Sequence, residues 1–401
     1  MEGRDGGGTP AGPRSRLSRE RERRLREVRR RRRAALGGVA ALALVGGALV
    51  GAAGGGDDTS AGTAATTIPS QCEGADAKAW PRLAGQRIMV RTDGTPDSKL
   101  LRRARKGEIA GVIVFPGVGV EQEQITAGLR ELQKAAETGG QPPLIVATDQ
   151  EGGPVKRFTN DPPLRSPYDL GRNGDAPDAR LEGQATGTFL RRVGVNTDLA
   201  PVLDVPATPD AVIAFRSFGD TPDDVTRKGL AFATGLGQER VLATAKHFPG
   251  LGRSLLNTDF SPSEIDASRE DLREDLAPFR AAIRQGIPLI MVGSAAYPAL
   301  GPNGPAALQQ EIATGLLRDR LGFEGVSITD DLQAGALSAS LDSGEAAERA
   351  ARAGMDLLLF AGDSAPDAHE RLTRALGLAR LDSEQARESC VRVVELRESL
   401  R

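Results

Sequence analysis

The chain has 401 residues, of which 39% are hydrophobic and 26% charged, the balance of a soluble globular protein and not of a disordered one. This length accommodates one large domain or two ordinary ones. The net charge of −2 hides an asymmetry, because residues 1–33 carry thirteen Arg against five acidic residues and so hold +8, which leaves about −10 for the remainder.

The N-terminal region combines a basic segment with an apolar run. The basic segment ends in Arg29–Arg33, and a charge-free run follows from Ala34 to Ala53. A run of this length can cross a bilayer as a helix. Basic residues before it would keep that end inside and place the rest of the chain outside. We therefore expect residues 34–53 to be a retained single-pass membrane anchor. A cleaved signal peptide, followed by secretion, is the main alternative, and a soluble cytosolic chain is the third.

The Arg-rich stretch Ser18–Arg33 also has the charge of a nucleic-acid-binding segment. A basic flank beside a membrane span explains the same charge, because anionic lipid attracts it. We therefore expect residues 1–33 to be a cytoplasmic flank without a nucleic-acid partner. Residues 54–75 are mostly Gly, Ala, Thr, Ser and Asp without apolar periodicity, which indicates a flexible linker. The folded domain is expected at 76–401.

Beyond residue 80, short apolar runs alternate with longer amphipathic segments. The expected strands are Arg87–Val90, Gly111–Phe115, Leu144–Thr148, Asn196–Leu199, Ala243–Lys246, Leu289–Val292, Val326–Thr329 and Asp356–Phe360. The clearest expected helices are Gln122–Thr138, Ala179–Val193, Asp223–Glu239 and Arg269–Gln285. Such alternation indicates a parallel sheet covered by helices. Eight units in about 310 residues fit a closed α/β barrel, the (β/α)₈ TIM barrel, better than a doubly wound sheet.

No Gly-rich phosphate fingerprint follows the first expected strand, which counts against a dinucleotide-binding fold. We expect neither a cofactor nor a metal ion. Charged residues do follow three of the strands: Asp149, the pair Lys246-His247, and the pair Asp330-Asp331. Because active sites of barrel enzymes lie at the C-terminal ends of the strands, these residues are expected to converge on one rim.

The segment Leu144–Phe158, which reads LIVATDQEGGPVKRF, resembles the signature of bacterial family 3 β-N-acetylglucosaminidases. Further matching segments are Asp198–Val205, Arg216–Gly219, Ala245–Gly250 and Gly325–Leu332. They occur in the family's order and span essentially all of residues 80–400. The combination is specific for glycoside hydrolase family 3 and less specific for one substrate.

This resemblance implies a role for each matching residue. Asp330 corresponds to the catalytic nucleophile, and the residues that hold the terminal sugar through its hydroxyl groups correspond to Asp149, Arg157, Arg216, Lys246 and His247. A carboxylate and cationic donors form charge-assisted hydrogen bonds that fix a pyranose ring. A carboxylate nucleophile then forms a covalent glycosyl intermediate, as in retaining hydrolysis. Asp331 is expected to be structural.

The sequence departs from the family in one loop. Where the family carries Asp-Ser-His, whose His is the general acid/base, this chain has Asn257-Thr258-Asp259. The only histidine besides His247 is His369, far along toward the last helix. Two outcomes remain open. Asp259 serves as the acid/base with Asn257 positioning it, or the loop has been abandoned and the barrel binds sugar without efficient hydrolysis.

Glu264 and Asp266 are weaker candidates for the acid/base in the same loop. Aromatic residues make up only 3% of the chain, which favours a compact pocket for one terminal sugar over a long polysaccharide cleft. The expected function is a membrane-tethered, extracytoplasmic retaining β-glycosidase, exo-acting on N-acetylglucosaminides from the cell wall or on other β-linked sugars. The alternatives are a glycan-binding protein on the same barrel and, in third place, a membrane-surface or nucleic-acid factor.

The chain has two cysteines, Cys72 and Cys390, one at each end of the expected domain. In a closed barrel the first and last units are neighbours, and an extracytoplasmic location is oxidising, so a disulfide is expected. Two free thiols, with Cys390 buried on the last helix, are the alternative.

Overall fold

The computed structural model describes residues 68–401 apart from 75, 302–303 and 363–364. The expected basic segment (1–33), the expected membrane anchor (34–53) and the first fourteen positions of the expected linker (54–67) lie outside the described residues. Among the residues that are described, no helix has both the length and the apolar character needed to cross a membrane.

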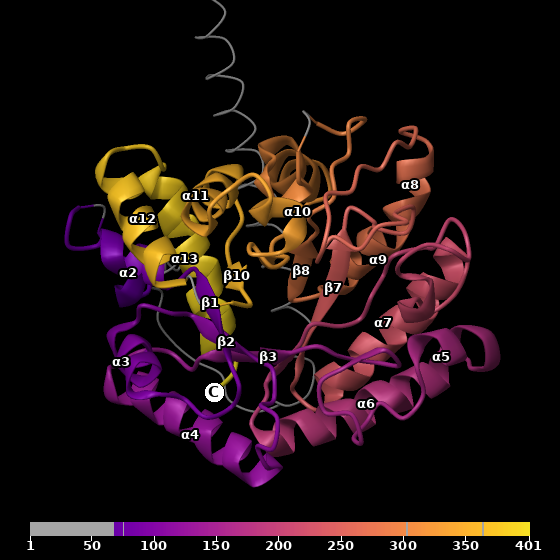
Figure 1. Ribbon diagram of the computed structural model, residues 1–401, viewed down its shortest axis with the longest axis horizontal. Helices are drawn as coiled ribbons and strands as arrows, with labels where there is room; N and C mark the ends of the chain where they lie inside the picture. The colour runs from indigo at the N-terminus through magenta and orange to yellow at the C-terminus, as the bar shows by residue number, and fades with distance from the viewer. Residues whose placement is uncertain (1–67, 75, 302–303, 363–364) are drawn as a thin grey trace, which may run out of the picture. The chain divides into compact units, whose positions relative to one another are not determined.

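Eight short parallel strands form the centre of the fold (Figure 1). They are β1 (Ile88–Thr92), β2 (Gly111–Val114), β3 (Ile145–Thr148), β6 (Thr197–Asp198), β7 (Leu242–Phe248), β8 (Leu289–Val292), β9 (Val326–Thr329) and β10 (Leu358–Phe360). Their hydrogen-bonded order is β10-β1-β2-β3-β6-β7-β8-β9. Ile328 of β9 also bridges Leu357, directly before β10, so the sheet closes on itself. The expected barrel is confirmed.

Most side chains on both faces of the sheet are apolar, as a buried parallel sheet requires. Successive residues of one strand point to opposite faces, so Met89 of β1 joins an inner cluster while Ile88 and Val90 join an outer one. The inner cluster is built mainly from strand residues such as Ile113, Met291 and Ile328, and it fills the barrel. The outer cluster packs the strands against the helices.

Helices follow the strands and lie outside them (Figure 1). They are α2 (Trp80–Gly85), α3 (Ser98–Lys106), α4 (Gln122–Thr138), α5 (Pro167–Asn173), α6 (Ala176–Val193), α7 (Pro222–Gln238), α8 (Asp271–Asp275), α9 (Ala277–Gln285), α10 (Gly335–Ser338), α11 (Ser343–Ala353), α12 (Ala365–Gly377) and α13 (Ser383–Glu398). A π-helix, η4 (Glu311–Arg320), precedes β9. Short 3₁₀ helices are η1 (Ser70–Cys72), η2 (Ala214–Arg216) and η3 (Ala306–Leu308).

Capping residues explain where several helices begin and end. Helix α4 has the expected bounds, because Glu121 and Gln124 form a capping box at its start. Helix α6 starts at Ala176, three positions earlier than expected, because Asp175 caps it. The single helix expected at Arg269–Gln285 is wrong. It is split into α8 and α9 at Leu276, because Pro278 occupies the first turn of α9 and cannot continue a preceding helix.

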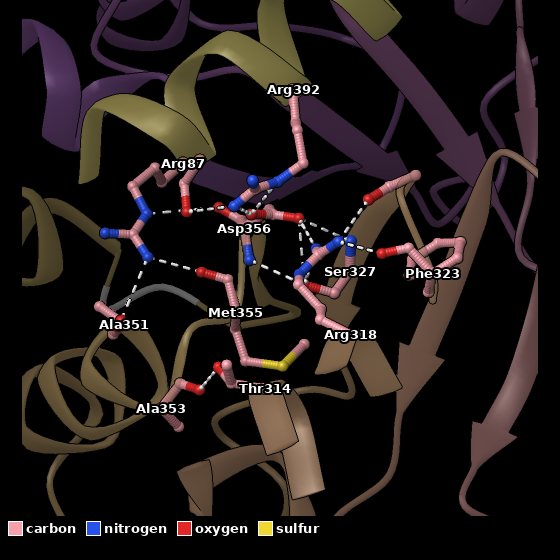
Figure 2. A network of polar contacts seen from close by, with 12 residues as sticks. Arg87, Thr314, Arg318, Phe323, Ser327, Ala351, Ala353, Met355, Asp356 and Arg392 are labelled. Carbon is pink, nitrogen blue, oxygen red and sulfur yellow. Dashed lines mark hydrogen bonds and ion pairs between the residues drawn. The ribbon is translucent and has the colours of Figure 1, made fainter. Parts of the chain in front are cut away.

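A buried carboxylate, Asp356, joins the two ends of the barrel (Figure 2). It accepts hydrogen bonds from the backbone N–H of Ser327 in β9 (2.9 Å), from Arg392 of α13 (2.9 and 3.1 Å) and from Arg318 of η4. Burial opposes its ionisation, but the charges of Arg318 and Arg392 outweigh that effect and hold the pKa of Asp356 below its usual value.

Arg87, directly before β1, completes this network from the other side. Its guanidinium donates to the carbonyl of Met355 (2.5 Å) and, at longer range, to those of Ala351 and Asp356 (both 3.4 Å) (Figure 2). The first and last strands of the barrel are therefore tied by charge-assisted hydrogen bonds as well as by strand pairing.

The two cysteines, from the first and the last elements of the described domain, lie together in space. Cys72 of η1 and Cys390 of α13 form a disulfide with a Cα–Cα distance of 5.6 Å, across 318 positions of sequence. The bridge fastens the segment that enters the barrel to the last helix.

Candidate active site

Two of the expected sugar-binding residues, Asp149 and Lys246, form the centre of a charged cluster at the strand ends. Asp149 follows β3, and Lys246 lies in β7. The Lys246 Nζ is 2.8 Å from Asp149 Oδ1, and Arg157 Nη2 is 3.0 Å from Asp149 Oδ2. Burial alone would raise the pKa of Asp149, but the charges of Lys246 and Arg157 outweigh it and lower the pKa to about 2. Asp149 is therefore an anion throughout the neutral range.

A hairpin that the sequence analysis missed brings Arg157 to this cluster. Strands β4 (Gln150–Gly152) and β5 (Val155–Lys156) pair antiparallel directly after β3. The turn passes through Gly152 and Gly153, whose φ angles of +96° and +60° suit glycine. Its return leg places the N–H of Arg157 3.2 Å from the carbonyl of Asp149. The guanidinium of Arg157 also lies 4.3 Å from the ring centroid of Phe115, which holds it by a cation–π contact.

Glu151 connects the remaining cation to the cluster and was also missed. Its carboxylate accepts two hydrogen bonds from Arg216, both 2.8 Å, and lies 2.6 Å from Lys246 Nζ. Burial opposes ionisation of Glu151, but Arg216 and Lys246 lower its pKa to about 2. The side chain of Glu151 is almost wholly buried, whereas that of Arg216 is partly exposed. Glu151 therefore positions Arg216, whose side chain keeps an exposed fraction of 18%.

His247 is held by Asp204, a residue inside the matched segment Asp198–Val205 that received no role from the sequence. Asp204 Oδ2 lies 2.7 Å from His247 Nδ1, and the same carboxylate accepts the backbone N–H groups of His247 and Leu251. An ionised carboxylate can only accept, so Nδ1 carries the proton and Nε2 is left for a ligand.

Asp198, at the end of β6, is a further buried acid of the cluster. Its Oδ1 accepts the N–H of Gln150 (3.0 Å), while its buried Oδ2 has no hydrogen-bond partner among the described residues. Burial, with the nearby charges of Asp149 and Glu151, raises the pKa of Asp198 to about 8 although Lys246 opposes it. Asp198 is therefore protonated at neutral pH.

Asp330, the expected nucleophile, follows β9 and is half-buried. Its Oδ1 accepts the N–H of Asp331 at 2.9 Å. Burial raises the pKa of Asp330 above its usual value; the nearby His247 and Lys246 oppose this rise, and the negative charge of Asp259 adds to it. The expected nucleophile therefore lies within electrostatic range of His247, Lys246 and Asp259.

Asp331 has a different environment from its neighbour. Its Oδ1 accepts the N–H groups of Gln333 and Ala361, both at 3.0 Å. These bonds tie the loop after β9 to the end of β10, which is a structural task.

The loop Asn257-Thr258-Asp259, which differs from the family's pattern, is hydrogen-bonded to the segment that follows Asp330. The carbonyls of Thr258 and Asp259 accept the N–H groups of Ala336 (3.0 Å) and Gly335 (2.8 Å). The side chain of Asn257 accepts the N–H of Asp259 at 2.9 Å, so it orders the backbone at that point. The side chain of Asp259 is exposed.

The weaker candidates for the acid/base lie further along the same loop. Glu264 and Asp266 are exposed and flank Ile265, whose N–H donates to the carbonyl of Ala296 (2.9 Å). His369 belongs to α12, and its Nε2 lies 2.9 Å from the carbonyl of Pro81 in α2. Across the described part of the chain, no group of three or more His, Cys, Asp or Glu is arranged to hold a metal ion.

Comparison with known proteins gives consistent matches. The family model described as the glycosyl hydrolase family 3 N terminal domain matches residues 85–396. A protein of Arthroderma benhamiae named "Uncharacterized secreted glycosyl hydrolase" is 36% identical over 328 residues, covering 79% of this chain and 93% of the relative. A protein of Nitrosomonas eutropha named "Beta-hexosaminidase" is 34% identical over 282 residues, covering 67% of this chain and 77% of the relative.

Among solved structures, the glycoside hydrolase family 3 beta-N-acetylglucosaminidase from Paenibacillus sp. FPU-7 matches with a TM-score of 0.76 and 32% identity. The match covers 79% of this chain and 62% of that chain, so this protein spans less than two thirds of the Paenibacillus one. The resemblance drawn from the sequence is confirmed: this chain belongs to glycosyl hydrolase family 3 and is a glycoside hydrolase.

Proposed function

We propose that the protein is a retaining, exo-acting β-N-acetylhexosaminidase that removes a terminal β-linked N-acetylglucosamine from cell-wall-derived or other glycosides. The observation that carries this proposal is the position of Asp330, directly after β9, at the strand ends where the ion-paired cluster of charged side chains also lies. The negative charge of Asp330 interacts with His247 and Lys246, and Lys246 is in turn fixed by Asp149 and Glu151. The names of the hexosaminidase relatives support the substrate.

The cluster offers a preorganised cradle for one pyranose ring. Asp149 accepts hydrogen bonds from two sugar hydroxyls, while Arg157, Arg216, Lys246 and Nε2 of His247 hold others. Because these side chains are already paired within the protein, little conformational entropy is lost when the sugar binds. Asp330 then attacks the anomeric carbon, the bond to the aglycone oxygen breaks, and a glycosyl ester forms on Asp330.

Asp259 supplies the proton that the departing oxygen needs in this proposal. The loop around it is docked beside the nucleophile, and the two carboxylates repel each other when both are ionised, so in the proposed reactive form Asp330 is ionised and Asp259 is protonated. Formation of the ester removes the charge of Asp330, so an ionised Asp259 is no longer repelled and can take a proton from the incoming water. This exchange of roles is the one that retaining hydrolysis requires.

The proposed location is outside the cell membrane, with residues 34–53 as a retained anchor. Secretion after cleavage of that segment is the second possibility. The disulfide between Cys72 and Cys390 supports either extracytoplasmic location, because such bonds persist in oxidising compartments. The Arthroderma relative, which is named as secreted, supports the second.

The test is hydrolysis of aryl β-N-acetylglucosaminide by the full chain, with aryl β-glucoside for comparison and the first-formed anomer read by NMR. We expect β-N-acetylglucosamine to form first, and Asp330→Asn to lower kcat by at least about a thousandfold because it removes the nucleophile. Initial release of the α-anomer, or activity of Asp330→Asn within tenfold of the wild type, would refute the proposal. Intact folding of that variant is checked by its thermal transition.

A further inference from the structure

The loop that carries Asp259 has an ordered base. Ser254 Oγ and Ser263 Oγ are 2.6 Å apart, and both residues are buried together with Thr258. The carbonyls of Thr258 and Asp259 are held by the segment after the nucleophile, as described above. The backbone of residues 254–263 is therefore fixed relative to Asp330.

On this fixed backbone three large apolar side chains face solvent. The exposed fractions are 66% for Leu255, 52% for Leu256 and 79% for Phe260. Single exposed apolar residues are ordinary on protein surfaces, but a group of them beside the proposed acid/base is not explained by folding. Phe260 directly follows Asp259, the residue proposed to protonate the departing oxygen.

A fourth residue extends the group across the neighbouring loop. Phe215, next to Arg216, is 60% exposed, and one side of its ring packs on Tyr168 with a centroid distance of 5.1 Å. The loop that carries Phe215 is joined to the base of the Asp259 loop, because the N–H of Val212 donates to the carbonyl of Ser254 (2.9 Å). The four residues Phe215, Leu255, Leu256 and Phe260 are here called the apolar rim.

We propose that the apolar rim binds the aglycone of the substrate and that this aglycone is apolar, an alkyl or alkylaryl group. The inference rests on the proposed function, because it requires a terminal sugar seated between Asp149 and Asp330. The leaving group must lie beside the residue that protonates it, which is Asp259. Phe260 of the apolar rim is the next residue in the chain. Leu255 and Leu256 cannot stack on a sugar ring, and residues 254–263 contain no basic side chain that would favour an anionic aglycone.

The test uses 4-methylphenyl and 4-butylphenyl β-N-acetylglucosaminides with the full chain. Their phenols have nearly equal acidity, so leaving-group chemistry is constant and only apolar length varies. We expect kcat/KM of the wild type to rise about tenfold with the butyl group, the effect of roughly half-burying three methylene groups. In the double variant Phe260→Ser, Leu256→Ser we expect the rise to fall below about twofold.

Leu181→Ser and Leu378→Ser are matched controls, because both leucines are more than half exposed, Leu181 on α6 and Leu378 after α12. Both controls should keep the tenfold rise. An equal rise in the rim variant and the wild type, or no rise in the wild type, would overturn the inference. If kcat/KM of the wild type does not depend on alkyl length and the rim variant loses activity on a disaccharide glycoside, the aglycone is a second sugar and not an apolar group.

The same pair of glycosides is titrated calorimetrically into Asp330→Asn, which leaves them intact. We expect Kd to fall about tenfold with the butyl group, and the fall to disappear when the rim is substituted in this background. If the wild type shows no turnover but Kd still falls with the butyl group, the proposed function is refuted and binding of the alkyl group by the apolar rim stands. Turnover with a Kd that ignores alkyl length would refute the rim alone.

Discussion

Asp204 holds His247 twice, since its carboxylate accepts both the ring Nδ1–H and the backbone N–H of that residue. The imidazole is thereby fixed in one tautomer and one orientation, with Nε2 as its remaining polar atom. This chain has Asp259 where the family carries its catalytic histidine. His247 is therefore the only imidazole near Asp330.

Asp204→Asn should therefore lower kcat/KM by about ten- to a hundredfold, the effect of disturbing a buried, charge-assisted pair. An amide can donate to Nδ1 and reverse the tautomer, so sugar binding should weaken and KM should rise. Steady-state kinetics on an aryl β-N-acetylglucosaminide measure this. Unchanged kinetics in a folded variant would mean that the orientation of His247 does not matter for binding.

Asp259→Asn should slow substrates with poor leaving groups by about a hundredfold or more, and activated aryl glycosides much less, because only the former need protonation. Azide should restore part of the activity by attacking the glycosyl intermediate without base assistance. Equal loss on both substrate types, without rescue, would remove Asp259 from the mechanism.

The same variant should change the pH profile on activated substrates. Asp330 must be ionised to attack, so activity falls as the pH drops through its raised pKa. The negative charge of Asp259 is one cause of that raised pKa, so its removal should move the acid limb of kcat/KM to lower pH. A limb that stays in place or moves upward would show that the two carboxylates do not interact.

Asp198→Asn should change how stability depends on pH. The folded protein keeps Asp198 protonated up to a pKa of about 8, whereas an unfolded chain ionises it near 4. Between these values the unfolded state binds fewer protons, so wild-type stability falls as pH rises through this window. Asparagine carries no such charge, so the urea midpoint of the variant should exceed that of the wild type by more at pH 8.5 than at pH 5. A difference between the midpoints that does not grow from pH 5 to pH 8.5 would contradict a protonated Asp198.

Replacement of both Cys72 and Cys390 by Ser should lower the free energy of unfolding by up to ~5 kcal/mol, since the bridge closes a very long loop. The single variants, each with one free thiol, serve as controls and should be destabilised similarly. Mass spectrometry of the denatured, unreduced protein should find no alkylatable thiol. Two reactive thiols would mean that the bridge does not form in the expressed protein.

The sequence predicted the barrel well because its signals are local. All eight expected strands are present within two residues of their expected ends, and the capping residues Glu121 and Gln124 explain why α4 has the expected bounds. The positioning residues were missed because their partners are remote in sequence. Glu151 binds Arg216 across 65 positions and Asp204 binds His247 across 43, and only the closed barrel brings these pairs together.

The network around Asp356 has a consequence for the order in which the protein can assemble during synthesis. Residues 356–401 supply β10, which lies between β1 and β9, and also Arg392 and Cys390. A nascent chain that lacks them leaves both of those strands with an unpaired edge and Arg87 without the carbonyl of Asp356. The barrel therefore closes only after nearly the whole chain has left the ribosome.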